Sequence, residues 1–273
     1  MMSLFSYDFF LHSAIAVLLT GLITGIIGSI VVVRRMVFVS GGITHSSFAG
    51  LGLGFFLGHN PLLYAMGAAL LSGLGVEWLS RWGRVREDSA IAAIWSLGMA
   101  LGVLFTFLTP GYTPGLSSFL FGNILLVSPL ELWLLLGYAI LSLFVVIRWY
   151  RPLVYLSFDP QFMEVRGMRC RFYQYLIIAW ISIGIVLSIR VMGIMMLMSM
   201  LTLPQMMVGQ WTESVRGMMT YSSVTSIVAV LIALFISYFF NLPTGVVAVL
   251  LLSVLYLISK LMISLRNKRH HCA

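Results

Sequence analysis

The chain has 273 residues, of which 60% are hydrophobic and 9% are charged. A soluble domain carries about 25% charged residues, so this chain has too few charges to cover a globule in water. Its formal net charge of +8 would suit a nucleic-acid-binding protein. The basic residues, however, lie in short loops beside apolar runs, where anionic lipid and membrane orientation account for them. We therefore expect a membrane protein with lipid as a partner and no nucleic acid.

Apolar runs of the length that a bilayer needs, about 20 residues, recur along the whole chain. They lack the two-residue alternation of barrel strands, and lipid tolerates no unpaired backbone, so we predict helices. The fold class is all-α, a polytopic membrane protein with about nine transmembrane helices, or eight as the alternative. The predicted spans are 9–33, 42–58, 62–80, 89–109, 129–147, 172–189, 192–208, 219–240 and 245–263.

The segment 110–127 is the least regular of the apolar stretches. Gly111, Pro114, Gly115 and Gly122 interrupt it and leave only a short apolar core. We predict an external loop with a half-buried helix that does not cross the membrane. If this segment does cross, the number of spans changes.

The basic residues give the predicted orientation. Fifteen of the 16 fall on one side of the nine-span arrangement, and only Arg190 falls on the other. The positive-inside rule makes the first side the cytoplasm, with the N-terminus outside and the C-terminus inside. Cys170 and Cys272 are then both cytoplasmic, so no disulfide is expected.

The acidic residues exclude several classes of membrane protein. All eight lie at span ends or in loops, whereas proton- or sodium-coupled carriers and aspartyl intramembrane proteases hold carboxylates inside the bundle. The chain also has no Gly-x-Ser-x-Gly elbow with a histidine partner and no phosphate-binding Gly-x-x-x-x-Gly-Lys loop. We predict no enzyme activity, no catalytic residue and no bound cofactor, so a partner must hydrolyse any ATP.

The cytoplasmic segment of about 150–171 is the only sizeable polar stretch. Asp159 followed by Pro160 predicts a helix start, with an N-cap acceptor and then proline at the first helical position. Gly167 predicts the end of this helix after about two turns. A second helix is expected to enter the membrane near Arg171.

Phe162 and Val165, with Met163 as a further candidate, are predicted to form one apolar face of that short helix. Such a face would dock into a groove on a soluble subunit, which is a common recognition mode. The alternative is a surface loop that only connects two spans. The residues alone leave both interpretations open.

His45 lies among small and hydroxylated residues at the start of the second span, between Thr44 and Ser46. A neutral imidazole binds transition metals, so His45 could line a path for a metal ion, with the two hydroxyls as weaker contacts. The alternative is a histidine that hydrogen-bonds a neighbouring backbone carbonyl, and the residues alone favour it.

Methionines crowd the seventh predicted span. A ladder for a soft metal is one interpretation, but the residues lie all round a helix, which favours flexible core filling. They are Met192, Met195, Met196, Met198, Met200, Met206 and Met207.

Glycines recur on two of the predicted spans and are expected to permit close helix packing without contacting a ligand. They are Gly21, Gly25 and Gly28 on the first span, and Gly50, Gly52 and Gly54 on the second.

Six segments, in order over residues 10–263, resemble the permease subunit of the metal-type ATP-binding-cassette importers for zinc, manganese and iron. Permeases for vitamin B12 and siderophores are similar at a greater distance. The segments are VRRMVFVSGGITHS at 33–46 (family RRM…GDALSHA), EDSAI at 87–91 (EDTAIG), FLFGNILLVSP at 119–129 (YLFGDLLAVSP), DPQFMEVRG at 159–167 (DPEFARALG), VMGIMMLMSMLTLP at 191–204 (VGALLVxALLIIP) and NLPTG at 241–245 (DLPSG).

Three positions depart from the family pattern in the same way. Gly41, Asn123 and Asn241 stand where the family has acidic residues. The family places the carboxylate and the histidine of its first motif near the metal path, and only His45 of that pair is present here. Residues 205–209 replace the family's PAATA.

The resemblance implies a type II importer-like bundle with residues 1–273 as a single transmembrane permease domain in the bacterial inner membrane. It implies three partners: an ATP-binding-cassette ATPase that uses the ATP, a second permease copy in a homodimer, and an extracytoplasmic metal-binding protein. The metal and path residue would be His45, with Thr44 and Ser46 beside it. The ATPase-coupling residues would be Asp159, Pro160, Phe162, Glu164, Val165 and Gly167. The alternative function is a permease for a metal chelate or a siderophore-like organic substrate.

Overall fold

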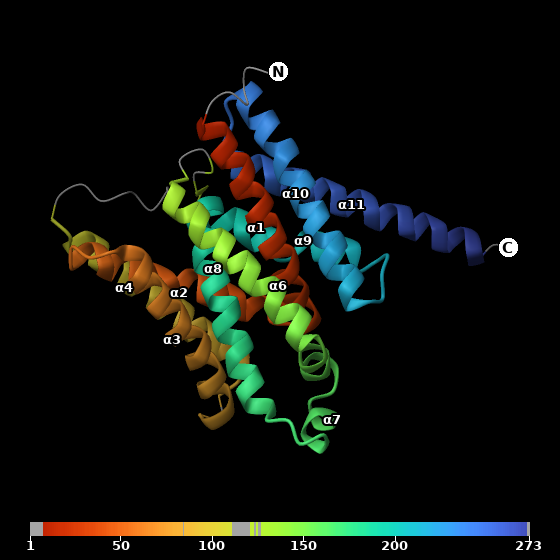
Figure 1. Ribbon diagram of the computed structural model, residues 1–273, viewed down its shortest axis with the longest axis horizontal. Coiled ribbons are helices and arrows are strands. Elements are labelled where there is room, and N and C mark those ends of the chain that lie inside the picture. Colours follow the sequence, from red (N-terminus) through yellow and green to blue (C-terminus); the bar gives the residue numbers. More distant parts are fainter. Residues whose placement is uncertain (1–7, 84, 111–120, 123, 125–126, 272–273) are drawn as a thin grey trace. The chain divides into compact units, whose positions relative to one another are not determined.

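The computed structural model describes residues 8–83, 85–110, 121–122, 124 and 127–271, and within them the regular structure is helical (Figure 1). The chain forms two compact units, and each is assembled from stretches that are far apart in the sequence. Unit 1 comprises Met1–Val32, Phe121–Phe144 and Val191–Ala273, and unit 2 comprises Val33–Leu120 and Val145–Arg190. The all-α membrane fold class predicted from composition is confirmed.

Unit 1 contains α1 (Asp8–Val33), α9 (Leu203–Val208), α10 (Val215–Phe240) and α11 (Thr244–His271). Glycines bring the backbones of α1 and α10 together, because a Cβ on Gly21 would lie 2.6 Å from the side chain of Ile227 and one on Gly25 would overlap Ser223. Gly28 lies against Gln205 of α9 in the same way. The predicted close packing along α1 is confirmed.

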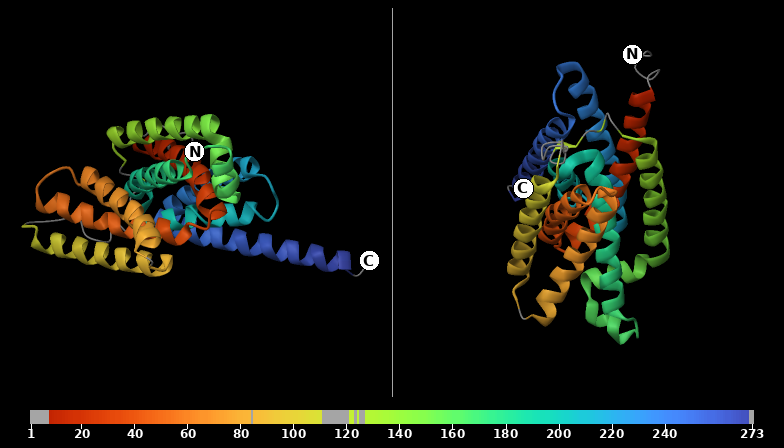
Figure 2. Two further views of the ribbon diagram at one scale, coloured as in Figure 1. Left: turned by 90° about the horizontal axis from the view of Figure 1, so that it is seen from below. Right: turned by 90° about the vertical axis from the view of Figure 1, so that its left-hand side faces the viewer.

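Unit 2 contains α2 (Val37–Phe56), α3 (Pro61–Trp82), α4 (Glu87–Leu108) and α7 (Pro160–Val165). Figures 1 and 2 show α2, α3 and α4 side by side. The backbone of α2 touches both neighbours, since a Cβ on Gly50 would lie 2.7 Å from the Cα atom of Ala65 in α3, and one on Gly52 would lie 2.6 Å from the carbonyl oxygen of Gly102 in α4. Most of α2 is buried as a result.

Two long helices contribute to both units. The first, α6 (Pro129–Phe158), is bent at Trp149, three residues before Pro152, whose ring removes a backbone donor. It continues about ten residues past the predicted span 129–147, so the first part of the polar segment is helix rather than loop.

The second, α8 (Cys170–Met200), passes through the boundary predicted between spans 172–189 and 192–208. Its irregular residue is Gly193, with φ 74° and ψ 165°, a backbone conformation that only glycine adopts readily. The predicted span 192–208 is therefore the last turns of α8 followed by the six-residue α9, rather than one helix.

Seven helical segments of the described chain are long and apolar enough to cross a membrane. The prediction of about nine spans differs in two ways: it divided 170–208 into two spans, and it counted α2, whose hydroxyl and histidine side chains make it less apolar. The half-buried helix predicted within 110–127 falls largely on residues outside the described ones.

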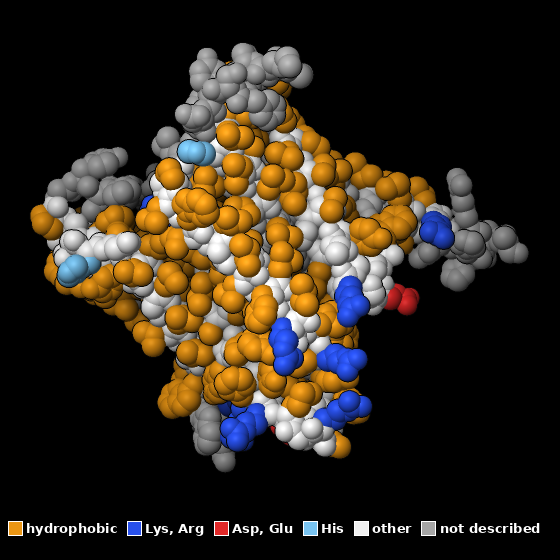
Figure 3. Space-filling view, in the orientation of Figure 1, with side chains coloured by type: hydrophobic (Ala, Val, Ile, Leu, Met, Phe, Trp, Pro, Cys, Tyr) orange, Lys and Arg blue, Asp and Glu red, His pale blue; other side chains and the backbone are white. Residues whose placement is uncertain are grey.

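The surface has the character expected of a chain in lipid. Hydrophobic side chains cover most of the face in Figure 3, while Lys and Arg side chains gather around α7 and the adjoining end of α6. This grouping in unit 2 agrees with the predicted cytoplasmic position of the segment 150–171.

Candidate functional site

His45 projects from α2 toward α4 within unit 2. Its imidazole stacks on the indole of Trp95, with ring centroids 4.2 Å apart and planes 10° apart. Among the described residues, no hydrogen-bond partner meets its buried Nδ1 atom. The hydrogen bond to a backbone carbonyl that was the alternative interpretation is therefore not seen at this nitrogen.

Thr44 and Ser46 flank the histidine, and both are buried. The Thr44 hydroxyl donates to the carbonyl of Ser40 at 2.7 Å, and the Ser46 hydroxyl donates to that of Ile43 at 3.2 Å. Successive residues of a helix point about 100° apart. The three predicted path residues thus share a turn of α2 but not a common face.

The metal-binding capacity of this turn is small. Gly41, at the position where the resembling family has a carboxylate, is buried one turn before His45. In the described part of the chain, no group of three or more His, Cys, Asp and Glu side chains could hold a metal ion. A single imidazole with nearby hydroxyl oxygens suits brief contact with a passing ion rather than storage.

The segment 159–167 has the predicted local structure. Helix α7 begins at Pro160, and the carboxylate of Asp159 accepts a hydrogen bond from the backbone N–H of Phe162 at 2.9 Å. The chain leaves this helix at Gly167, whose φ of 72° lies in the left-handed region. The predicted N-cap and terminating glycine are confirmed.

The apolar face predicted for α7 is confirmed for Phe162 and Val165, which are both exposed, and is wrong for the further candidate Met163. Met163 is fully buried, whereas Val165 is 86% exposed and Phe162 is 39% exposed. Residues two apart in a helix point to nearly opposite sides, so Met163 anchors α7 to unit 2 while Val165 faces outward.

Two features around α7 were missed in the sequence. Phe158, the last residue of α6, is 65% exposed and adds a third apolar side chain to those of Phe162 and Val165. The guanidinium of Arg166 lies over the ring of Phe162 at 4.9 Å and that of Tyr155 at 5.9 Å. These contacts join the end of α7 to the last turn of α6.

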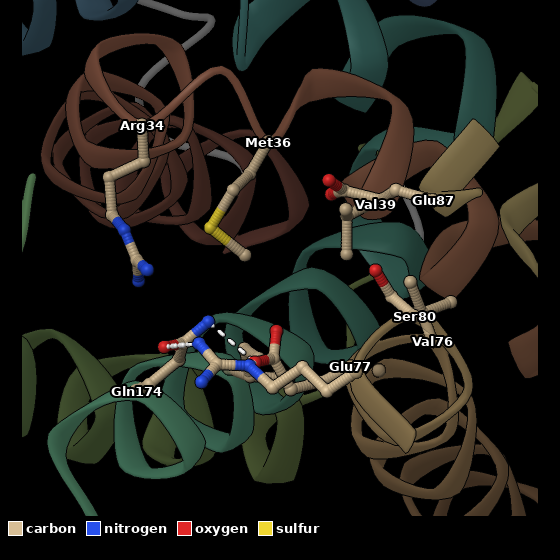
Figure 4. A pocket seen from close by; sticks show the side chains of 11 residues that line it. Arg34, Met36, Val39, Val76, Glu77, Ser80, Glu87 and Gln174 are labelled. Atoms are coloured by element: carbon tan, nitrogen blue, oxygen red, sulfur yellow. Dashed lines mark hydrogen bonds and ion pairs between the residues drawn. The ribbon is translucent and has the colours of Figure 1, made fainter. Parts of the chain in front are cut away.

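A polar cavity of about 240 Å³ lies in unit 2 where the ends of its helices meet (Figure 4). Arg81 pairs with Glu77 one turn earlier in α3 and also bonds the side-chain oxygen of Gln174 in α8. Gln174 in turn donates to Glu77 at 2.6 Å, which closes the cluster. In the sequence, Arg81 indicated only the orientation of the chain, and no signal pointed to this cluster.

Arg34 projects into the same cavity. Its Nη1 atom is buried and, among the described residues, has no hydrogen-bond partner. Burial lowers the pKa of the Arg34 guanidinium, and the nearby Glu77 partly offsets this effect. An arginine remains charged through such a shift, so the cavity contains a positive charge that has no ion-pair partner among the described residues.

Three methionines of α8 pack in the core of unit 1. Met192, Met196 and Met200, spaced four residues apart, are almost completely buried. This arrangement confirms core filling for these three.

The chain is similar to a membrane protein of Synechocystis sp., slr2045, with 35% identity over 259 residues, covering 95% of this chain and 92% of that protein. It is also similar to the manganese import system permease protein ScaB of Streptococcus gordonii, with 29% identity over 256 residues, 94% of this chain and 92% of ScaB.

Among solved structures, a chain of PsaBC from Streptococcus pneumoniae, in complex with Fab, superposes with a TM-score of 0.85 and 26% identity, covering 94% of this chain and 92% of that chain. The two chains are therefore similar in fold as well as in sequence. Residues 6–263 match the ABC 3 transport family, and the chain therefore belongs to that family.

Proposed function

We propose that this chain is the transmembrane permease subunit of an ATP-driven importer that moves divalent metal ions across the cytoplasmic membrane. Manganese is the first candidate, and zinc and iron are the others. The observation that carries the proposal is the similarity to a manganese import permease along 94% of the chain. The metal is the cargo, so this chain needs to bind it only weakly.

His45 is the proposed contact for the passing ion. The stack on Trp95 limits rotation of the imidazole. Its buried Nδ1, which no described residue meets with a hydrogen bond, leaves one ring nitrogen available as a ligand. A neutral imidazole binds zinc, iron and manganese to differing degrees. One such ligand gives an affinity low enough for the ion to move on.

Energy would come from a partner ATPase that docks at α7. In a segment outside lipid, the exposed side chains of Phe158, Phe162 and Val165 are better explained by a protein partner than by water. Closure of the ATPase pair would push on α7 and re-tilt the helices between two packed states. A second permease copy and an extracytoplasmic metal-binding protein would complete the importer.

The proposed orientation places the N-terminus outside and the C-terminus in the cytoplasm. The basic side chains around α7 support this assignment.

Uptake of radioactive manganese into proteoliposomes that contain the permease and its co-purified ATPase tests the proposal. We expect ATP-dependent uptake that falls severalfold in His45→Ala. His59→Ala is the matched control, because His59 lies in the turn between α2 and α3 with an exposed ring. Uptake that persists without ATP, or uptake only of a metal chelate, would contradict the proposal. Unchanged uptake of every metal by His45→Ala would remove His45 from the path.

A further inference from the structure

The polar cavity of unit 2 is lined by two charged groups that do not belong to the cluster of Glu77, Arg81 and Gln174. Arg81 and Glu77 neutralise each other, with Gln174 bonded to both. Within the described residues, Arg34 and Glu87 line the same cavity without an ion-pair partner. Among the described residues, the cavity thus presents one guanidinium and one carboxylate without an ion-pair partner.

These two groups face the cavity from different sides. Figure 4 shows the guanidinium of Arg34 and the carboxylate of Glu87 pointing inward from opposite walls, with Met36 between them and Gln174 and Glu77 along a third wall. A buried N–H without an acceptor is costly, so an anion beside Arg34 would be stabilising. A cation beside the carboxylate of Glu87 on the opposite wall would be stabilising too, so the complementary ligand carries both a negative and a positive charge.

The position of the cavity at the ends of three helices indicates the source of this ligand. Arg34 directly follows the last residue of α1, Arg81 lies in the last turn of α3, and Glu87 is the first residue of α4. Helix ends mark the membrane–water interface, where lipid headgroups lie. Pockets with basic residues at this level between membrane helices are suited to lipid phosphates.

We propose that this cavity binds the zwitterionic headgroup of a phosphatidylethanolamine, with the phosphate on Arg34 and the ammonium on Glu87. The planar guanidinium donates two hydrogen bonds to phosphate oxygens, and the ammonium donates to the carboxylate. Val39, Val76 and Ile178 form an apolar part of the wall, against which the glycerol and the first acyl carbons would lie. This site is separate from His45 and does not depend on the transported substrate.

Native mass spectrometry of the full-length permease tests the proposal, with phosphatidylethanolamine, phosphatidylcholine and phosphatidylglycerol of the same acyl chains as probes. We expect phosphatidylethanolamine to be retained most strongly, because a trimethylated ammonium cannot donate a hydrogen bond and phosphatidylglycerol has no cation for Glu87. Soluble phosphoethanolamine should compete only at much higher concentration if the ligand is the lipid. Equal competition would assign the site to the free ester and overturn the lipid proposal.

Variants then separate the two contacts. Arg34→Gln should weaken retention of the ethanolamine lipid about tenfold, and Glu87→Gln should abolish the preference over phosphatidylcholine. Arg34→Lys keeps the charge without the planar fork, so it should show a smaller loss of lipid retention. It replaces Arg34→Gln in the test if the glutamine variant does not fold. Arg35→Asn is the matched control, because Arg35 has a φ of 57° that asparagine tolerates.

Three results would overturn the proposal. They are equal retention of all three lipids by the wild type, a preference that survives Glu87→Gln, and displacement of the ethanolamine lipid by manganese at Glu87.

Discussion

The imidazole of His45 in α2 lies almost parallel to the indole of Trp95 in α4, and the two residues are fifty positions apart in the chain. An aromatic pair of this kind contributes about 0.5–1.5 kcal/mol beyond the area it buries. The stack therefore limits the imidazole to a small range of orientations, while its Nδ1 atom has no partner in the part of the chain that the structure describes.

Loss of the Trp95 ring should impair transport by releasing His45. We expect Trp95→Ala to lower manganese uptake about two- to tenfold, since the energy of an aromatic pair sets the scale, while Trp95→Phe keeps most of the rate. Uptake in proteoliposomes, measured with ATP hydrolysis in the same vesicles, checks this. Trp78→Ala is the control, because Trp78 is an exposed tryptophan of the same unit. An equal loss of manganese uptake in both alanine variants would show that Trp95 has no specific role in transport.

The close contact between α2 and α3 should make Gly50 intolerant of any side chain. Gly50→Ala places a methyl group against the backbone of Tyr64 and Ala65, and we expect destabilisation of about 1–3 kcal/mol. Gly67→Ala lies in the same apolar groove, where a Cβ meets nothing within 4 Å. It should leave the midpoint of thermal unfolding in detergent unchanged or slightly higher. Similar midpoints for the two variants would contradict the close approach.

The outward face of α7 should matter for the ATPase and not for the fold. We expect Val165→Asp to weaken co-purification of the ATPase at least tenfold, because it places a charge in an apolar contact, and to leave the thermal midpoint unchanged. Gln161→Asp adds the same charge at an exposed position of the same helix and is the control. Full ATPase binding by the Val165 variant would place the docking surface elsewhere.

The neighbouring residues Met195 and Met196 should respond very differently to truncation. Met196 is 1% exposed and Met195 is 51% exposed. Met196→Ala should lower the free energy of unfolding by about 2–5 kcal/mol, as for other large core residues, whereas Met195→Ala should change it by under about 0.5 kcal/mol. If Met196→Ala instead lost copper binding with its stability unchanged, the methionines would be better interpreted as a ladder for a soft metal.

Local rules account for what the sequence predicted well. The bounds of α7 followed from capping and backbone preferences, because these involve only backbone groups a few residues away from Asp159, Pro160 and Gly167. Long apolar runs identified most of the membrane helices for the same reason. The inward turn of Met163 and the exposure of Val165 depend on what α7 packs against, and a six-residue helix has too few residues to show a periodic face.

Long-range pairings had no local signal. Nothing near Gln174 indicates that its amide bridges Glu77 and Arg81 almost a hundred residues earlier. The bend at Gly193 was also hidden, because the apolar run on either side continues through it and one glycine is compatible with a regular helix. The family resemblance identified the transporter class but gave no indication of the ring stacked on His45.

The glycine contacts on both sides of α2 leave no layer of flexible side chains between its backbone and those of α3 and α4. Three helices in such contact cannot slide past one another without large clashes, because interiors packed at this density deform little. We therefore expect α2, α3 and α4 to move as one rigid piece during transport, so that the ion meets the same His45–Trp95 pair in every state. Spin labels on α2 and α4 should keep one distance with and without ATP, and a change of several ångströms would show that the pair itself opens.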